Sequence, residues 1–217
     1  MAVELNRRHV ISLAGAAVAG TAFANLAHAA EPAPSGSVDP VKLAEPGKLK
    51  DMVYGEANAP VTIVEYASLT CPHCADFTLN TFPKLKEKYI DTGKVRLIFR
   101  EFPFDPRAMA AFMLARCAPE ERYFPMIDVF FKQQRDWALA EDGKEALLQI
   151  AKLAGFTQES FEACLTNQQL LDDVKETVER GSKEFGVNAT PTFFINGKKY
   201  AGALSIDELS AIIDKLL

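Results

Sequence analysis

The stretch Cys71-Pro72-His73-Cys74 decides how this chain of 217 residues is interpreted, because it places two thiols three positions apart. An apolar run, Val61–Tyr66, precedes it and predicts a buried strand, and residues with helical character follow it. Positions i and i+3 of a helix share one face, so the two sulfurs can close a disulfide with little chain movement. The first thiol then lies at the positive end of the helix dipole, which favours the reactive thiolate. The pattern predicts a dithiol–disulfide redox centre.

Length and charge limit the class of protein. A chain of 217 residues suffices for one sizeable domain, or for a small domain with an insertion. The formal net charge of −5 argues against nucleic acid as the main partner, because phosphate binding requires a basic face. We therefore expect no nucleic-acid partner.

The N-terminal residues 1–29 have the layout of a bacterial-type export signal. Arg7 and Arg8 precede a weakly apolar stretch, Val10–Leu26, and a small-x-small cleavage site predicts cutting after Ala29. A membrane anchor is the alternative, and the arginine pair leaves both general secretion and twin-arginine export open. Export predicts a periplasmic location, where disulfides persist.

The rest of the chain predicts an α/β fold. Residues 30–50 are rich in Pro, Ser, Gly and Ala and predict a flexible leader. A short strand over 51–55, the strand over 61–66, a helix with a break at Pro83 and a strand over 95–100 then predict a β-α-β unit with parallel strands.

A helical block and a second β segment follow. Residues 107–185 carry helical periodicity, and Gly186 ends the last of these helices. Strands over 192–195 and 198–201 flank Asn196-Gly197, the strongest short hairpin signal in the chain, and a capping box opens the final helix. The order predicts a thioredoxin-like domain, residues 51–105 and 186–217, with an inserted helical domain over 106–185.

The motif set is similar to that of a known family. A C-P-H-C motif after a strand, a Thr190-Pro191 pair before a hairpin and a helical block between them resemble the DsbA-like thiol:disulfide oxidoreductases of the thioredoxin-like superfamily. The resemblance covers the chain from about Met52 to the C-terminus. It implies that Pro191 is a cis-proline facing the dithiol and that Thr190 contacts the bound peptide.

The same resemblance implies roles for five further residues. Cys71 is expected to be the exposed nucleophile, and Cys74 the buried resolving thiol. Pro72 and His73 form the dipeptide that sets the redox poise, and a protonated His73 adds a nearby positive charge. Glu65 matches the acidic group beneath the active site of this family. A charged residue in a buried strand is rare without a reason, so we expect Glu65 to handle the proton of Cys74. A salt bridge to a lysine is the alternative.

The expected function is that of an exported oxidase without a cofactor. Its Cys71–Cys74 disulfide passes to unfolded or reduced exported proteins through a mixed disulfide, and the family implies reoxidation by a membrane partner of the DsbB type. A leader without heptads favours a monomer over a dimeric or trimeric isomerase. A disulfide isomerase or reductase of the same fold remains open, as does a non-catalytic metal-binding or substrate-holding module.

The four cysteines leave two further alternatives. Cys71 and Cys74 could form half of a zinc site or a purely structural bridge, although zinc usually requires four ligands and we expect no metal here. Cys117 and Cys164 lie on apolar helical faces and are either buried free thiols or a second, structural disulfide. We expect the disulfide, because unpaired thiols are uncommon in exported proteins.

Overall fold

The computed structural model of the chain describes residues 32–217, and the predicted export signal lies outside these described residues. One sheet of six strands forms the centre, in the order β1-β6-β5-β3-β4-β2. β3 and β4 are parallel, as predicted, and β5 and β2 flank them in antiparallel orientation. The strands are β1 (Gly36–Ser37), β2 (Met52–Tyr54), β3 (Val61–Ala67), β4 (Val95–Glu101), β5 (Thr192–Ile195) and β6 (Lys198–Ala201).

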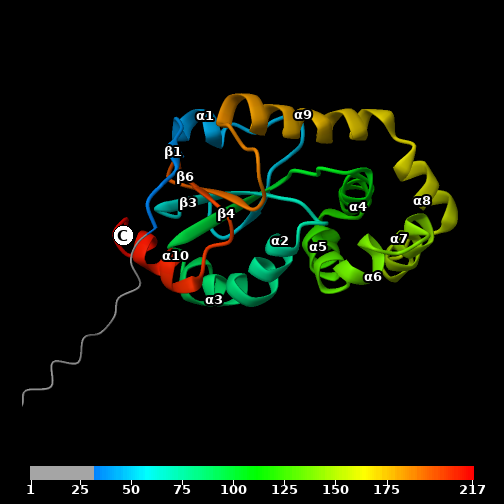
Figure 1. Cartoon of the computed structure of the whole chain (residues 1–217), viewed down its shortest axis with the longest axis horizontal. Helices are drawn as coiled ribbons and strands as arrows, with labels where there is room; N and C mark the ends of the chain where they lie inside the picture. The colour runs from blue at the N-terminus through cyan, green and yellow to red at the C-terminus, as the bar shows by residue number, and fades with distance from the viewer. Residues whose placement is uncertain (1–31) are drawn as a thin grey trace, which may run out of the picture.

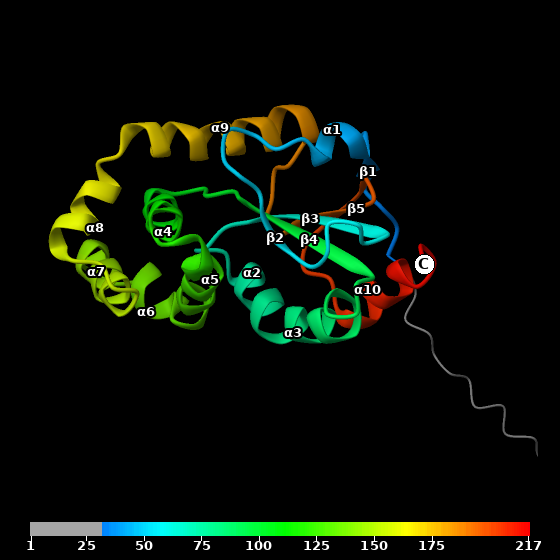
Figure 2. The ribbon, with the colours of Figure 1, turned by 180° about the vertical axis from the view of Figure 1, so that it is seen from behind.

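Helices cover both faces of the sheet, as Figure 1 and the reverse view in Figure 2 show. α1 and α9 lie on one face, α2, α3 and α10 lie on the other, and α4 to α8 form a block beside the sheet. The helical segments are α1 (Pro40–Ala44), α2 (Pro72–Asp76), η1 (Phe77–Thr81), α3 (Phe82–Leu85), η2 (Lys86–Ile90), α4 (Pro106–Cys117), η3 (Glu120–Arg122), α5 (Tyr123–Lys132), α6 (Gln134–Ala138), α7 (Gly143–Leu153), α8 (Gln158–Leu165), α9 (Gln168–Phe185) and α10 (Ile206–Ile213). This is the predicted α/β class with a thioredoxin-like arrangement.

Alternation along β3 separates two cores. Ile63 and Ala67 belong to a large apolar core on the α2 side, whereas Val64 and Tyr66 belong to a smaller core under α9. Because side chains of a strand alternate between faces, Glu65 points to the same face as Ile63. The strand thus directs one carboxylate into the layer that holds the dithiol.

Residues 36–44 correct the expectation of a flexible leader over 30–50. β1 pairs with β6, and the backbone N–H of Val38 donates to the carbonyl of Gly197. Asp39 caps α1, and Leu43 is buried in the core under α9. The elements are two and five residues long, so they carry no periodicity that the sequence alone would show.

Within the predicted helical block, α5 and α6 follow one another almost directly but are two separate helices. The break between α5 and α6 falls at Gln133, whose backbone leaves helical geometry. Trp137 is buried, and its indole N–H donates to the carbonyl of Phe130, which holds the two helices together. The break places Gln134 against residues 69–71, which lead from β3 into α2 and are called the dithiol turn below.

The predicted bridge between Cys117 and Cys164 is present and joins α4 to α8. It spans 47 positions of the chain. A cross-link over a loop of this length restricts the unfolded chain and so stabilises the block of helices. No helix within residues 32–217 is both long and apolar enough to cross a bilayer.

Gly181 sets how closely α9 approaches the sheet. A Cβ at this position would lie 2.8 Å from a ring carbon of Tyr66 and 3.1 Å from one of Phe102. We expect Gly181→Ala to lower the free energy of unfolding by about 1–3 kcal/mol, because overpacking outweighs the gain of about 1 kcal/mol in helix propensity. Chemical denaturation measures this.

Ser182→Ala is the matched control, because Ser182 is the next residue of α9 and is exposed. It should leave stability unchanged or slightly higher. A Gly181→Ala protein at least as stable as the wild type would show that α9 does not pack as described.

Candidate active site

The two thiols of the motif lie at the start of α2 and differ in exposure. Cys71 is the N-cap residue, with extended backbone angles, and Pro72 occupies the first helical position. Cys71 is half-buried and Cys74, one turn later, has no exposed surface. Both are free thiols in this structure. One sulfur is therefore accessible to another molecule, while the other is accessible only to its neighbour.

Hydrogen-bond donors favour the thiolate of Cys71. The Cys74 thiol donates to it, and the Thr190 hydroxyl and the backbone N–H groups of His73 and Cys74 add further donors, which together lower its pKa to about 5. Burial opposes this shift. Because the thiolate is the reactive form, Cys71 is ionised and nucleophilic at neutral pH.

Burial acts in the opposite direction on Cys74 and Glu65. It raises the pKa of Cys74, and the bond to Cys71 and the negative charges of Glu65 and Cys71 raise it further. Burial and then the charge of Cys71 raise the pKa of Glu65 to about 8. Among the described residues no ion pair involves Glu65, and its Oε1 atom has no hydrogen-bond partner. A salt bridge to lysine, the alternative role for Glu65, is absent from residues 32–217.

The chain returns to the dithiol at Thr190. The Thr190–Pro191 peptide bond is cis, as the resemblance implies, and the carbonyl of Thr190 lies 3.2 Å from the sulfur of Cys71. That carbonyl only accepts, so it binds the thiol form, and the donors named above outweigh it. Pro191 is buried and Thr190 is half-buried, which leaves the backbone of Thr190 beside the reactive sulfur.

Comparison with known proteins agrees with this geometry. A family model described as Thioredoxin matches residues 48–215. The crystal structure of Wolbachia pipientis alpha-DsbA1 is 36% identical, with a TM-score of 0.74, and the match covers 82% of this chain and 96% of that one. The chain belongs to the DsbA-like branch of the thioredoxin family.

Other relatives are similar over part of their length. A protein of Rickettsia bellii named as a protein-disulfide oxidoreductase is 36% identical over 168 residues, which are 77% of this chain and 64% of that protein. The chain thus spans less than two thirds of that curated relative. BdbD from Bacillus subtilis, in its oxidised form, shares the fold at 24% identity and a TM-score of 0.68, over 76% of this chain and 92% of that one.

The helical block of this DsbA-like protein contributes a residue that the sequence analysis missed. Gln134 is buried, and its side-chain amide donates to the carbonyls of Leu69 (2.8 Å) and Cys71 (2.9 Å). A second contact joins Thr70 to Asp105, the residue that caps α4. These bonds hold the dithiol turn from the side of the helical block. No sequence signal marks Gln134, because a glutamine in a helix is most often an exposed residue.

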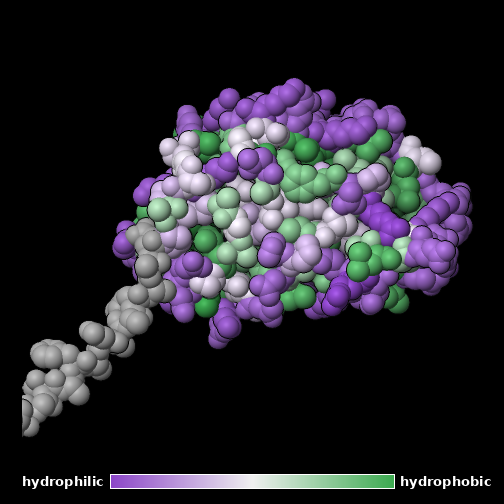
Figure 3. Space-filling model, in the orientation of Figure 1, coloured by the Kyte–Doolittle hydropathy of each residue, from purple (hydrophilic) through white to green (hydrophobic). Residues whose placement is uncertain are grey.

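A hollow of about 630 Å³ opens beside the dithiol, between the segment α2–η1 and helices α5 and α6. Pro72, Ala75 and Leu79 form one wall, and Phe131 and Leu139 belong to the other. Figure 3 shows pale and green side chains over the middle of this face, whereas hydrophilic side chains follow α9. His73 and Pro72 are exposed beside the hollow.

Among the described residues, metal ligands do not gather around the dithiol. Within residues 32–217 no three His, Cys, Asp or Glu side chains are placed to hold a metal ion. His73 is in the same helical turn as Cys74. Glu65 lies on β3, on the side of Cys74 that faces the sheet. Thiol–disulfide exchange requires two sulfurs that differ in reactivity, and Cys71 and Cys74 supply them.

Thiolate absorbance should reveal the asymmetry of the two thiols. In the reduced protein we expect one titration with a midpoint near pH 5, because the pKa of Cys71 is lowered to about 5. Ultraviolet absorbance of the thiolate measures it. Cys71→Ser should abolish the titration and Cys74→Ala should move it upward, because alanine removes the strongest donor to the Cys71 sulfur. A single midpoint between about pH 8 and pH 9, the ordinary range of a cysteine, would contradict the described site.

Glu65→Gln should stabilise the reduced protein at neutral pH. A pKa raised from 4.5 to about 8 makes the folded state less stable as the pH rises above 4.5, until the carboxyl ionises near pH 8. At pH 7 the glutamine should therefore add about 2–3 kcal/mol to the free energy of unfolding, and the gain should vanish below about pH 4.

Denaturant titrations across this pH range measure the effect. Glu56→Gln, at an exposed position, serves as the control and should change little. Equal stability of wild type and Glu65→Gln at both pH 4 and pH 7 would mean that Glu65 is ionised in an environment different from the one described.

Proposed function

We propose that this chain is an exported thiol:disulfide oxidoreductase that donates its Cys71–Cys74 disulfide to folding proteins. One observation carries the proposal: a half-exposed thiol whose pKa is lowered to about 5 stands beside a buried thiol whose pKa is raised. Stabilising the Cys71 thiolate stabilises the reduced pair. A stabilised reduced form makes the disulfide form the stronger oxidant.

The reaction proceeds in two exchanges. A substrate thiolate attacks the sulfur of Cys71 and forms a mixed disulfide, and the electron pair of the broken bond leaves on Cys74, which takes up a proton. A second substrate thiolate then attacks the substrate sulfur of the mixed disulfide and releases Cys71 as a thiolate. The substrate gives up two electrons and the dithiol receives them. The low pKa of Cys71 makes it a good leaving group in the second step.

The backbone beside Pro191 is the proposed docking edge for substrate. Thr190 stands next to the sulfur of Cys71, where an extended chain can pair with its backbone groups by strand addition. Because backbone groups are common to all sequences, this mode of binding requires no particular substrate sequence. It therefore suits unfolded and reduced exported proteins of many kinds. His73 and Pro72, exposed at the rim, set the redox poise of the couple.

The cellular setting follows from the same proposal. The export signal predicted over 1–29 would deliver the chain to the periplasm as a monomer, where the Cys117–Cys164 bridge persists. A membrane redox partner of the DsbB type would reoxidise the dithiol after each cycle. The helical domain, residues 106–185, would serve to hold the dithiol turn through Gln134, whose side-chain amide donates to the carbonyls of Leu69 and Cys71.

Single-cysteine variants test the proposal. Pre-oxidised wild type should form bridges in a reduced, unfolded protein, as measured by the loss of free thiols. Cys71→Ser should be inactive, because Cys74, the remaining thiol of the pair, is buried. Cys74→Ser should form a mixed disulfide with a substrate that already contains a disulfide, because its Cys71 thiolate attacks one substrate sulfur and the other leaves as a thiolate. This species should accumulate on a non-reducing gel, because the Cys74 thiol that would displace the substrate by attacking Cys71 is missing.

Replacing Cys117 and Cys164 together by Ala is the control and should preserve bridge formation. Two outcomes would contradict the proposal: oxidised wild type that forms no bridges, or a Cys71→Ser protein as active as the wild type. Wild type that rearranges scrambled disulfides faster than it oxidises reduced protein would point to the isomerase instead.

A further inference from the structure

A buried glutamine of the helical block contacts the backbone beside the reactive sulfur. Gln134 is the first residue of α6 and is 7% exposed. Its side-chain nitrogen, Nε2, donates to the carbonyl of Leu69 at 2.8 Å and to that of Cys71 at 2.9 Å. Carbonyl oxygens only accept hydrogen bonds, so these two partners determine which end of the amide faces the dithiol turn. Both hydrogens of the nitrogen are therefore used on the turn.

The carbonyl of Cys71 is the group through which this contact acts on the thiolate. It also accepts from the backbone N–H of Ala75, at 3.2 Å, where the hydrogen bonding of α2 begins. Covalent geometry holds the carbonyl oxygen of a cysteine within about 5 Å of its own sulfur. The negative end of this carbonyl therefore repels a thiolate on Cys71, and a donor bonded to the oxygen offsets that repulsion.

The contact has a different effect in the two redox states of the dithiol. The reduced pair carries a negative charge on Cys71 at neutral pH, because its hydrogen-bond donors lower its pKa to about 5. The disulfide carries no charge at this position. The positive end of the Gln134 amide therefore stabilises the reduced state more than the oxidised state. A stabilised reduced state makes the disulfide a stronger oxidant.

Helix α6 is fixed by contacts of its own, so the amide is held in place before any exchange occurs. The indole N–H of Trp137 donates to the carbonyl of Phe130 in α5, at 2.8 Å. The guanidinium of Arg107 in α4 donates to the carbonyl of Ala138, the last residue of α6, at 2.7 Å. A dipole held by its surroundings stabilises a charge without the cost of reorienting, so α4 and α5 support the effect of Gln134.

We propose that Gln134 is a positioning residue for thiol–disulfide exchange, whose amide favours the Cys71 thiolate through the carbonyl of Cys71 and so raises the oxidising power of the disulfide. It acts through the backbone of the turn and takes no part in the exchange between sulfurs. The inference deepens the proposed function and rests on it, because a donor of disulfides gains from a stabilised reduced state. The helical block then contributes to the redox chemistry as well as to the fold.

The titratable groups around Cys71 stay in place when the glutamine is replaced. Cys74 and His73 follow Cys71 in α2, and Glu65 lies on β3. Asp105, at the start of α4, accepts a hydrogen bond from the turn. Three charged side chains near the start of α6 are exposed to solvent: Lys132, Arg135 and Asp136. A change in the titration of Cys71 therefore reports on the glutamine itself.

Two substitutions with opposite expected effects test the proposal. Gln134→Met has a similar size and no donor, and it should raise the midpoint of the Cys71 titration by about 0.5–1 pH units. By linkage, the equilibrium constant with which the disulfide oxidises glutathione at pH 7 should fall by about three- to tenfold. Gln134→Lys restores a donor to the carbonyls and should leave the midpoint at or below that of the wild type. Thiolate absorbance and the glutathione equilibrium measure these changes.

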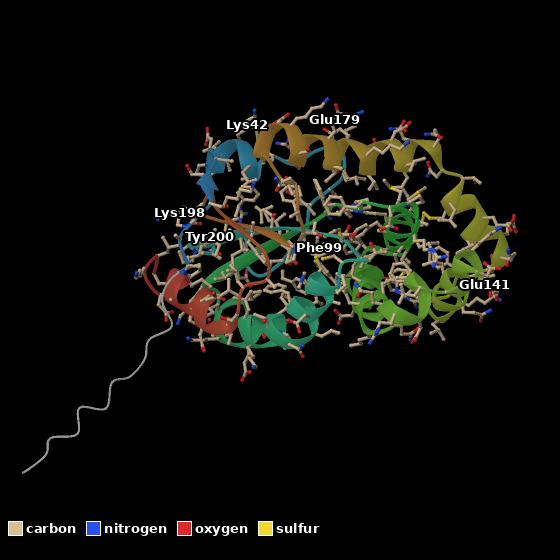
Figure 4. All side chains as sticks on the ribbon, viewed as in Figure 1. Lys42, Phe99, Glu141, Glu179, Lys198 and Tyr200 are labelled. Carbon is tan, nitrogen blue, oxygen red and sulfur yellow. A yellow bond between two sulfur atoms is a disulfide. The ribbon has the colours of Figure 1, made fainter. Side chains whose placement is uncertain are left out.

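Gln149→Met makes the same substitution at an exposed position of α7, and Glu141→Gln removes a charge where Figure 4 labels it, at the far end of the helical block. Both controls should match the wild type. A Gln134→Met midpoint equal to that of the wild type would overturn the proposal, as would an equal rise in the Met and Lys variants, which a purely structural role would produce.

Should Gln134→Met fail to fold, Gln134→Lys decides by itself, because a midpoint above that of the wild type would overturn the proposal and a midpoint at or below it would support it. Thermal denaturation of the oxidised proteins shows which variants fold. The two redox measurements need no protein substrate, so failure of the proposed oxidase activity would be recognised separately.

Discussion

The hydrogen bond from the Cys74 thiol to the Cys71 sulfur is the interaction on which the site depends. It requires the two sulfurs to lie one helical turn apart, with the outer one at the N-cap of α2 and the inner one fully buried. Burial keeps Cys74 protonated, and a protonated Cys74 is the strongest donor to the Cys71 thiolate. The same burial that makes one thiol inert therefore makes its neighbour reactive.

The sheet and the helical block hold this pair from opposite sides. β3 leads directly into the dithiol turn, and the cis bond before β5 brings the carbonyl of Thr190 to Cys71. From the helical block, Gln134 binds the carbonyls of the turn. A buried network of Glu101, Arg116 and Tyr123 joins β4 to α4 and to the start of α5. A shift of the helical block relative to the sheet would therefore displace the carbonyl of Cys71, to which Gln134 is bonded.

Strong local patterns in the sequence made much of the fold and of the site predictable. The dithiol motif, the parallel strands and the hairpin at Asn196-Gly197 follow from patterns that few alternatives satisfy, and the structure contains each of them. The bridge between Cys117 and Cys164 was predicted because export makes free thiols uncommon, and not from any local pattern.

Features that depend on distant contacts could not be predicted. β1 and α1 are too short for periodicity, and their positions are set by β6 and the core under α9. The buried position of Gln134 arises only when α6 packs against the residues that precede α2. The sequence marks Glu65 as a charge in a buried strand, but only the structure shows that it forms no ion pair with a lysine of residues 32–217.

The equilibrium between the Cys71–Cys74 couple and glutathione tests the central claim most directly. If the buried Cys74 stabilises the Cys71 thiolate as described, the couple should be strongly oxidising, with a reduction potential above about −200 mV. A potential at or below about −270 mV, the value of thioredoxin, would contradict it, because the reduced form would then gain no stability from the arrangement of the two thiols.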